Sequence, residues 1–128
     1  MCIRDSVDTD GSWEGWVPTS DGATFLNQPI GSMTGFPNNN TPADKATYTF
    51  TLSVPTTINL GASAAVANGV LTSKTAIAGS RTEWVWDVAK PMASELALIS
   101  IGRYNMSTST ITLANGLGTV QELSLIHI

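Results

Sequence analysis

The sequence predicts an all-β fold, either an antiparallel β-sandwich or a curved, saddle-like sheet. The first reason is the segment "KATYTFTLSVP", in which apolar and hydroxyl side chains alternate strictly, as they do in a strand with one buried face. The second reason is that short apolar segments and turn signals follow one another along most of the chain, while helical periodicity is almost absent. Closely spaced strands joined by turns are typical of antiparallel sandwiches.

The first half of the chain contains three predicted strands. "WEGWV" and "ATFLN" are predicted as short strands on either side of the turn "SDG". "TPADKA" can form one helical turn, with Thr41 as N-cap and Pro42 at the first helical position. The alternating segment over residues 45–55 follows, and Pro55 ends it because proline has no N–H to donate to a sheet.

The second half is predicted to contain two reversals and two further strands. The reversals lie at Asn68-Gly69, where both residues tolerate positive φ, and at residues 78–80. "SELALISIGRY" is apolar on both faces, as a central strand would be, and "STITLANG" is the predicted last strand. The side chains expected to supply most of the core are Tyr48, Phe50, Leu52, Trp84, Trp86, Leu96, Leu98, Ile99 and Ile101.

Composition excludes several classes of partner. The formal net charge is −4 and basic residues form no cluster, so we expect no binding to nucleic acid. No apolar run approaches the roughly 20 residues that a membrane-spanning helix needs, so no membrane segment is expected. Composition does not decide between a secreted and a cytoplasmic protein.

The two ends of the chain carry a pattern that belongs to DNA. When "MCIRDS" and "LSLIHI" are translated back into codons, the strings can be written as reverse complements over nearly their whole length. They resemble the transposon end that tags DNA for short-read sequencing. We therefore predict that residues 1–6 and 123–128 are translated adapter, that residues 7–122 are the genuine segment, and that both terminal hexapeptides pack poorly on the β-core.

The genuine segment lacks the side chains of the commonest catalytic and metal sites. Cys2 and His127, the only cysteine and the only histidine, both lie in the terminal hexapeptides. Residues 7–122 therefore offer no thiolate or imidazole ligand, no Ser-His-Asp triad and no disulfide, and we expect no metal site and no cofactor within them. Asp8 and Asp10 in "DTDGS" begin a calcium-loop pattern that the following residues do not complete.

Two other features have both a structural and a functional interpretation. Asn38–Asn40 precede a strand, and we expect their side chains to satisfy local backbone groups in a turn, as asparagines in loops commonly do. The Trp13/Trp16 and Trp84/Trp86 pairs could stack on sugars, although packing in the core is the favoured interpretation.

An ordered series of short motifs resembles a known family. "FP", "DKATY", "VANG", "PMA" and "IGRY" follow one another between about Gly11 and Tyr104. In this order they resemble the amino-terminal β-domain of zinc aminopeptidases of the aminopeptidase N type, which are gluzincin metallopeptidases, and most closely the actinobacterial branch. The resemblance implies that residues 7–122 are part of such a domain in a bacterial hydrolase, and that the sheet is incomplete because its first strands are absent.

The resemblance also implies a role for Gln28. In that family a Gln or Glu eight residues before the Phe of "FP" reaches the active site and holds the free α-amine of the peptide substrate, and here Gln28 stands eight residues before Phe36. The zinc ion and its H-E-x-x-H motif belong to the following catalytic domain, which would be the partner of this segment. The segment would then be a scaffold that is inactive alone. A purely structural role for Gln28, as a turn residue before Pro29, stays open.

The chain departs from the family pattern at two positions, and a second function is also open. Family members often carry Trp where this chain has Gly35, and an acidic residue or histidine near Asn40-Thr41. These departures leave any role carried over to Asn38–Asn40 unsupported. The alternative function is a β-sandwich binding or adhesion module that recognises glycan or protein.

Overall fold

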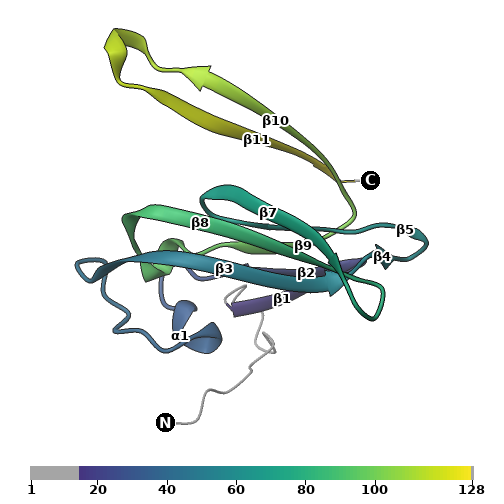
Figure 1. Ribbon diagram of the computed structural model, residues 1–128. Helices are drawn as coiled ribbons and strands as arrows, with labels where there is room; N and C mark the ends of the chain where they lie inside the picture. Colours follow the sequence, from purple (N-terminus) through teal and green to yellow (C-terminus); the bar gives the residue numbers. More distant parts are fainter. Residues whose placement is uncertain (1–14, 128) are drawn as a thin grey trace.

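The computed structural model describes residues 15–127, apart from the side chain of His127 (Figure 1). Strands account for 63% of the structure. Within residues 15–127, helical structure is limited to the four-residue α1 (Ser32–Gly35) and two 3-10 turns, η1 (Ser94–Leu96) and η2 (Ala114–Gly116). No helix in the described part of the chain is long and apolar enough to cross a membrane. The all-β prediction is confirmed.

One layer is an antiparallel sheet of four short strands in the order β1-β2-β9-β6. Its strands are β1 (Gly15–Thr19), β2 (Gly22–Leu26), β6 (Ala64–Ala67) and β9 (Ile99–Gly102). The turn between β1 and β2 lies at Ser20-Asp21, as predicted. Strand β9 is central, as its apolar sequence indicated, but it begins only at Ile99 because the preceding residues form η1.

The other layer is a three-stranded antiparallel sheet in the order β3-β8-β7. Its strands are β3 (Lys45–Pro55), β7 (Val70–Ile77) and β8 (Arg81–Ala93). The predicted reversal at residues 78–80 is the β7–β8 hairpin, where Gly79 (φ 78°) and Ser80 (φ 54°) both have positive φ. Residues 42–44 form a turn but no helix, so "TPADKA" contains no helical turn.

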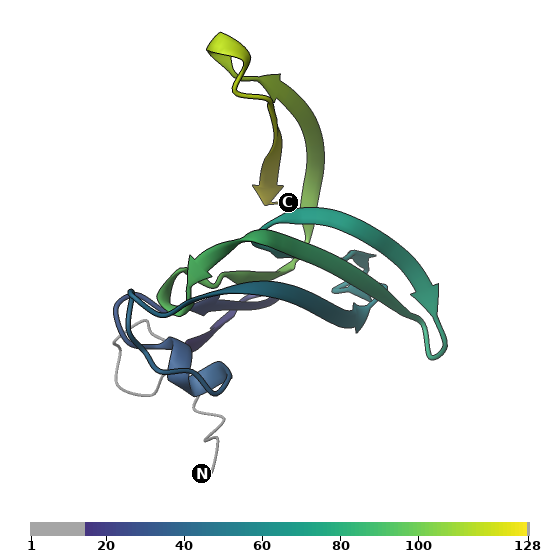
Figure 2. The same ribbon diagram turned by 60° about the vertical axis from the view of Figure 1, so that its left-hand side comes forward.

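Two small ribbons complete the structure. Strands β4 (Thr57–Ile58) and β5 (Gly61–Ala62) pair with each other, as do β10 (Tyr104–Thr112) and β11 (Thr119–His127). The β10–β11 hairpin projects away from the two layers in both views (Figures 1 and 2). Leu123 packs against the core, whereas Ser124–Ile126 are exposed. Met1–Ser6 lie outside the described residues, and the adapter interpretation stays a prediction.

The Asn68-Gly69 turn carries the chain from one layer to the other. Strand β6 before it belongs to the four-stranded sheet, and β7 after it belongs to the three-stranded sheet. Gly69 has φ 97°, and a Cβ there would lie 2.2 Å from the carbonyl oxygen of Asp87, so no other residue fits. Asn68 Oδ1 accepts a hydrogen bond from the backbone N–H of Leu98 at 2.5 Å. The turn residues are those predicted, but they join sheets and do not close a hairpin.

The core lies between the two layers, where two tryptophans of β8 pack on the alanines of β6. Trp84 is 2% exposed and Trp86 is 1% exposed. Indole Nε1 of Trp86 donates to the carbonyl oxygen of Ala65 at 3.0 Å, which ties one layer to the other. The buried cluster consists of Val54, Ala64, Ala65, Val66, Ala67, Trp84 and Trp86.

The predicted core is correct in part. Both tryptophans are buried, and Phe50, Leu52, Ile99 and Ile101 are partly buried against them. Leu96 (49% exposed) and Leu98 (39% exposed) do not belong to the core. They lie in or beside η1, where the backbone is not a strand, so the alternation that would have turned them inward does not apply.

A buried carboxylate fixes the β1–β2 turn to the end of β9. Asp21 is 4% exposed, and its Oδ2 accepts from the backbone N–H of Arg103 at 2.8 Å. The same oxygen lies 3.5 Å from Nε of Arg103, whose side chain is 32% exposed. The contact holds together two segments that are far apart in the sequence.

Replacing this carboxylate should destabilise the fold. We expect Asp21→Asn to lower the free energy of unfolding by about 1–2 kcal/mol, because a hydrogen bond to a charged acceptor is about twice as strong as a neutral one. Urea denaturation followed by tryptophan fluorescence measures the change. Asp44→Asn, at an exposed aspartate, is the matched control and should change stability by less than about 0.5 kcal/mol. Equal effects of the two substitutions would contradict the prediction.

Candidate functional sites at one end of the sheets

Gln28 lies in the turn that follows β2, and its side chain is exposed. The turn is closed by a hydrogen bond from the N–H of Gly31 to the carbonyl oxygen of Asn27 at 2.7 Å, and the peptide bond between Gln28 and Pro29 is cis. Gln28 is thus two residues beyond the end of β2, at Leu26. The role of Gln28 stays a prediction.

Gln28 borders a hollow of about 330 Å³. The hollow lies between the end of β2 and the segment that contains η1, and its lining residues are Phe25, Leu26, Asn27, Gln28, Glu95, Leu96, Ala97 and Leu98. Asn27 is 3% exposed, and its Nδ2 donates to the carbonyl oxygen of Ala97. Within the described part of the chain, Asn27 Oδ1 has no hydrogen-bond partner. Among the described residues that line this hollow, Gln28 offers an exposed amide and Glu95 a carboxylate as acceptors, and none is a Lys or Arg.

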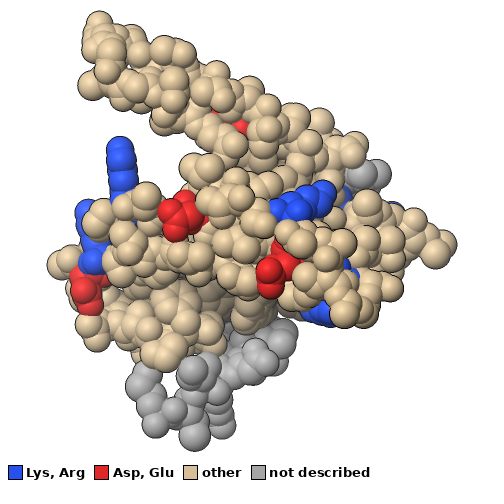
Figure 3. All heavy atoms as spheres, viewed as in Figure 1, with Lys and Arg blue, Asp and Glu red and all other residues tan. Residues whose placement is uncertain are grey.

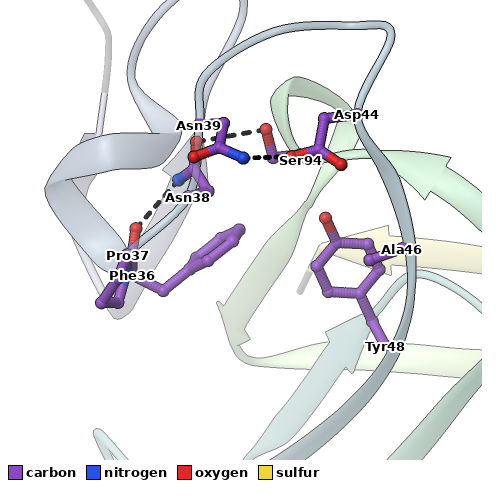
Figure 4. Close-up of a pocket in the computed structure, with 8 residues that line it drawn as sticks. All are labelled: Phe36, Pro37, Asn38, Asn39, Asp44, Ala46, Tyr48 and Ser94. Carbon is purple, nitrogen blue, oxygen red and sulfur yellow. Dashed lines mark hydrogen bonds between the residues drawn. The ribbon is translucent and has the colours of Figure 1, made fainter.

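Figure 4 shows a second hollow, of about 520 Å³. Neighbouring residues of η1 contribute to the two hollows, Ser94 to the second and Glu95 to the first. The residues that line the second hollow are Phe36, Pro37, Asn38, Asn39, Asp44, Ala46, Tyr48 and Ser94. Residues 36–44 come from the loop between α1 and β3, so this loop forms most of the wall.

Asn38 organises that loop by satisfying local groups, as predicted for a turn. Its Oδ1 accepts from the backbone N–H of Asn40 at 2.8 Å, and its Nδ2 donates to the carbonyl oxygen of Phe36 at 2.9 Å. The same Oδ1 also accepts from the hydroxyls of Ser32 and Ser94, each at 3.2 Å. Both serines are buried. Local turn chemistry could be predicted from the sequence, but the contact with Ser94 joins positions 56 residues apart, which no local pattern connects.

Aromatic rings run from the first layer to the second hollow. Trp16 lies 5.1 Å from Phe25, Phe25 lies 6.4 Å from Phe36, and Phe36 lies 6.0 Å from Tyr48, edge to face, all measured between ring centroids. Tyr48 stacks on Phe50 at 5.6 Å. Two rings of this row, Phe36 and Tyr48, line the second hollow with apolar surface, while Asn39 and Asp44 give it a polar side (Figure 4).

The environment of Tyr48 changes its acidity. Burial raises the pKa of the Tyr48 phenol above its ordinary value of 10.0, and the negative charge of Asp44 raises that pKa further. Because the folded-state pKa lies above the unfolded-state value, the neutral phenol stabilises the fold fully below pH 10. This contribution is lost as the pH rises through the folded-state pKa.

A tyrosinate titration tests this geometry. The chain has two tyrosines, so a Tyr104→Phe variant reports Tyr48 alone by the ultraviolet absorbance of tyrosinate. We expect a midpoint above the ordinary tyrosine value. Asp44→Asn should lower the midpoint but not restore the ordinary value, since burial remains. A midpoint that does not respond to Asp44→Asn would mean that the carboxylate does not face the phenol.

Other candidate sites receive less support. The described residues contain no group of three or more His, Cys, Asp or Glu that could hold a metal ion. Asp8, Asp10 and Trp13 lie outside the described residues. Trp84 and Trp86 are buried, so neither can serve as a platform for a sugar, and the core-packing interpretation is confirmed for this pair. On the face in Figure 3, charged side chains lie scattered among uncharged ones.

Comparison with known proteins relates this fold to one group of enzymes. No family model matches the sequence, and no curated protein matches it significantly. Among solved structures, an M1 zinc metallopeptidase from Deinococcus radiodurans matches with a TM-score of 0.74 and 25% identity, over 88% of this chain and 24% of its own. A mutant of a two-domain M1 zinc metallopeptidase bound to L-tryptophan matches with a TM-score of 0.72 and 25% identity, over 86% of this chain and 24% of its own. This chain contains an M1 aminopeptidase-like domain.

A more distant match agrees on the fold. Aminopeptidase A of Legionella pneumophila, in complex with aspartic acid, matches with a TM-score of 0.69 and 19% identity. That match covers 84% of this chain and 12% of the aminopeptidase. The M1-like domain therefore spans about a quarter of the first two proteins, at 24% each, and a smaller part of the third.

Proposed function

We propose that residues 7–122 are part of the amino-terminal β-domain of a bacterial zinc aminopeptidase, and that the terminal hexapeptides are translated adapter. The observation that carries the proposal is the match to an M1 zinc metallopeptidase at 25% identity over 88% of the chain. The ordered motifs from "FP" to "IGRY" support the proposal independently. They are a sequence resemblance to the same group of enzymes, and they are spread along most of residues 7–122. The actinobacterial branch is the closest source that these motifs indicate.

In this proposal the domain is a scaffold that contributes one contact to the substrate. The exposed amide of Gln28 can accept a hydrogen bond from the α-ammonium group of a peptide. Exposure at a strand end suits this role, because the side chain is then accessible to a following domain. A contact to the free amine would make the enzyme recognise where a peptide begins.

The hydrolytic chemistry is assigned to the following domain. The described residues do not fit a zinc site, since they contain no cluster of three metal-ligating side chains. In zinc peptidases the metal polarises the scissile carbonyl and activates water. The M1-like domain alone should therefore have no peptidase activity.

The proposal is tested by reading the gene beyond codon 122 and expressing the longer product. We expect an H-E-x-x-H motif downstream and chelator-sensitive release of amino-terminal residues from aminoacyl anilides. The 128-residue chain, assayed beside it, should release none. A downstream sequence that encodes another β-module, or a longer protein that is inactive with zinc present, would overturn the proposal and favour a binding module.

A further inference from the structure

We propose that the hollow between Phe36, Asp44 and Tyr48 is a binding site for the guanidinium group of an arginine side chain. The inference is independent of the proposed peptidase function, because it rests only on the second hollow. Its volume of about 520 Å³ falls in the range of small-ligand pockets. A guanidinium with its aliphatic stem needs an apolar wall and acceptors placed on one side.

The charge around the hollow favours a cation. Asp44 is the only charged side chain among the described residues that line it. Within the described part of the chain, the one ion pair joins Arg103 and Asp21, so no described Lys or Arg neutralises Asp44. The amide of Asn39 donates to Asp44 Oδ2 and holds the carboxylate at the edge of the hollow (Figure 4). The other carboxylate oxygen forms no hydrogen bond with a described residue, so an anionic ligand would meet uncompensated negative charge.

The polar atoms around the hollow favour a ligand with several donors. The hydroxyl of Tyr48 forms no hydrogen bond with any described residue, and in Figure 4 it points toward the side where Asp44 and Ser94 lie. Asn38 is already engaged with two serine hydroxyls and a backbone N–H, so it fixes the wall in place. A guanidinium has five N–H donors in a planar fork, which can serve the carboxylate and the phenol oxygen together.

The aromatic wall favours arginine over lysine. Phe36 and Tyr48 meet edge to face at 6.0 Å, and Tyr48 is stacked on Phe50. A planar guanidinium can stack on an aromatic ring while its N–H groups donate in its own plane, whereas an ammonium is more strongly hydrated and loses more on leaving water. A metal ion is disfavoured, because one carboxylate cannot replace its hydration shell.

Nuclear magnetic resonance titration of the 128-residue chain tests the site. The probe is Nα-acetyl-arginine amide, and the matched control ligand is Nα-acetyl-citrulline amide, which has nearly the same shape but no charge. We expect saturable shifts of the Asn39, Asp44 and Tyr48 signals with the arginine probe, and at least about tenfold weaker binding of the citrulline probe. This ratio corresponds to roughly one charge-assisted hydrogen bond.

Two variants distinguish arginine binding in the hollow from nonspecific attraction of a cation to an acidic protein. Asp44→Asn should weaken arginine binding about tenfold. Glu83→Gln removes the same charge at a position of β8 that does not line the hollow, and it should leave binding unchanged. Absence of saturable shifts, equal binding of both probes, or equal effects of the two variants would overturn the proposal.

The natural arginine can belong to a separate peptide or to another part of a longer protein, and the same titration distinguishes these sources. If the 128-residue chain binds the probe and a longer product of the gene does not, the hollow is filled from within the protein and is not open to a separate peptide. If both bind it, the site is open to a separate peptide. Failure of the peptidase assay affects neither result.

Discussion

Trp86→Ala should lower the free energy of unfolding by about 3–5 kcal/mol, which is among the largest costs expected of a single substitution. The indole is 1% exposed and fills the space between the two layers. Removing it leaves a cavity that the short β6 alanines cannot fill, and it removes the donor to the carbonyl oxygen of Ala65. Because small domains are stable by only about 5–15 kcal/mol, this loss is a large fraction of the total stability.

Chemical denaturation followed by far-ultraviolet circular dichroism measures the effect of Trp86→Ala. A matched pair of milder variants separates the hydrogen bond from the packing. Trp86→Phe removes an indole N–H that has a partner, whereas the indole N–H of Trp84 has none among the described residues. We therefore expect Trp86→Phe to cost about 1 kcal/mol more than Trp84→Phe. Equal costs would mean that the bond to Ala65 does not hold the layers together.

The strands of this protein were predictable wherever one face is buried and the other is not. Burial in strand β3 alternates from Thr47 to Pro55, and the bounds predicted for it, residues 45–55, agree with Lys45–Pro55. Strand pairing was harder to predict, because it depends on contacts between segments that are distant in the sequence. Asn68-Gly69 has the composition of a hairpin turn, yet β6 pairs with β9 and β7 with β8. Local turn chemistry specifies the reversal but not the sheet that each strand joins.

Part of the core was not predicted from the sequence, because it consists of small residues. The segment Ala64–Ala67 is buried throughout, although three of its four side chains are single methyl groups that give a weak hydrophobic signal. Leu96 and Leu98 give a strong signal and are exposed. Burial here depends on the packing partner. The indoles of β8 pack close to a strand backbone, and the small alanine side chains of β6 allow this close approach. A residue's own hydrophobicity does not report this complementarity.

The candidate sites also differ in whether they could be predicted from the sequence. Gln28 was singled out by its spacing to Phe36 in the family pattern, and it lies exposed in the turn that follows β2. The second hollow was not predicted, because it requires Ser94 and Tyr48 to meet a loop that is distant from Ser94 in the sequence. Only the unusual asparagine run pointed to that loop, and its local hydrogen bonds account for most of the run.

The strongest functional test of the peptidase proposal concerns Gln28. In the intact enzyme, Gln28→Ala should lower kcat/KM for aminoacyl substrates about ten- to a hundredfold, because a hydrogen bond to a charged group contributes about 1.5–3 kcal/mol. Gln28→Glu should retain most of the activity, since a carboxylate also accepts from an ammonium group. Stability should change by less than about 0.5 kcal/mol, because the side chain is exposed.

Steady-state kinetics and thermal melting of the same preparations distinguish this role from a structural one. Gln121→Ala is the matched control, because Gln121 is the only other glutamine and is also exposed, on the projecting β11. It should leave both kcat/KM and stability unchanged. If Gln28 only shapes the turn before Pro29, Gln28→Ala will lower the melting temperature and leave turnover intact. A well-folded Gln28→Ala enzyme with unchanged kcat/KM would exclude Gln28 from substrate recognition, because the α-ammonium contact would then contribute nothing to the transition state.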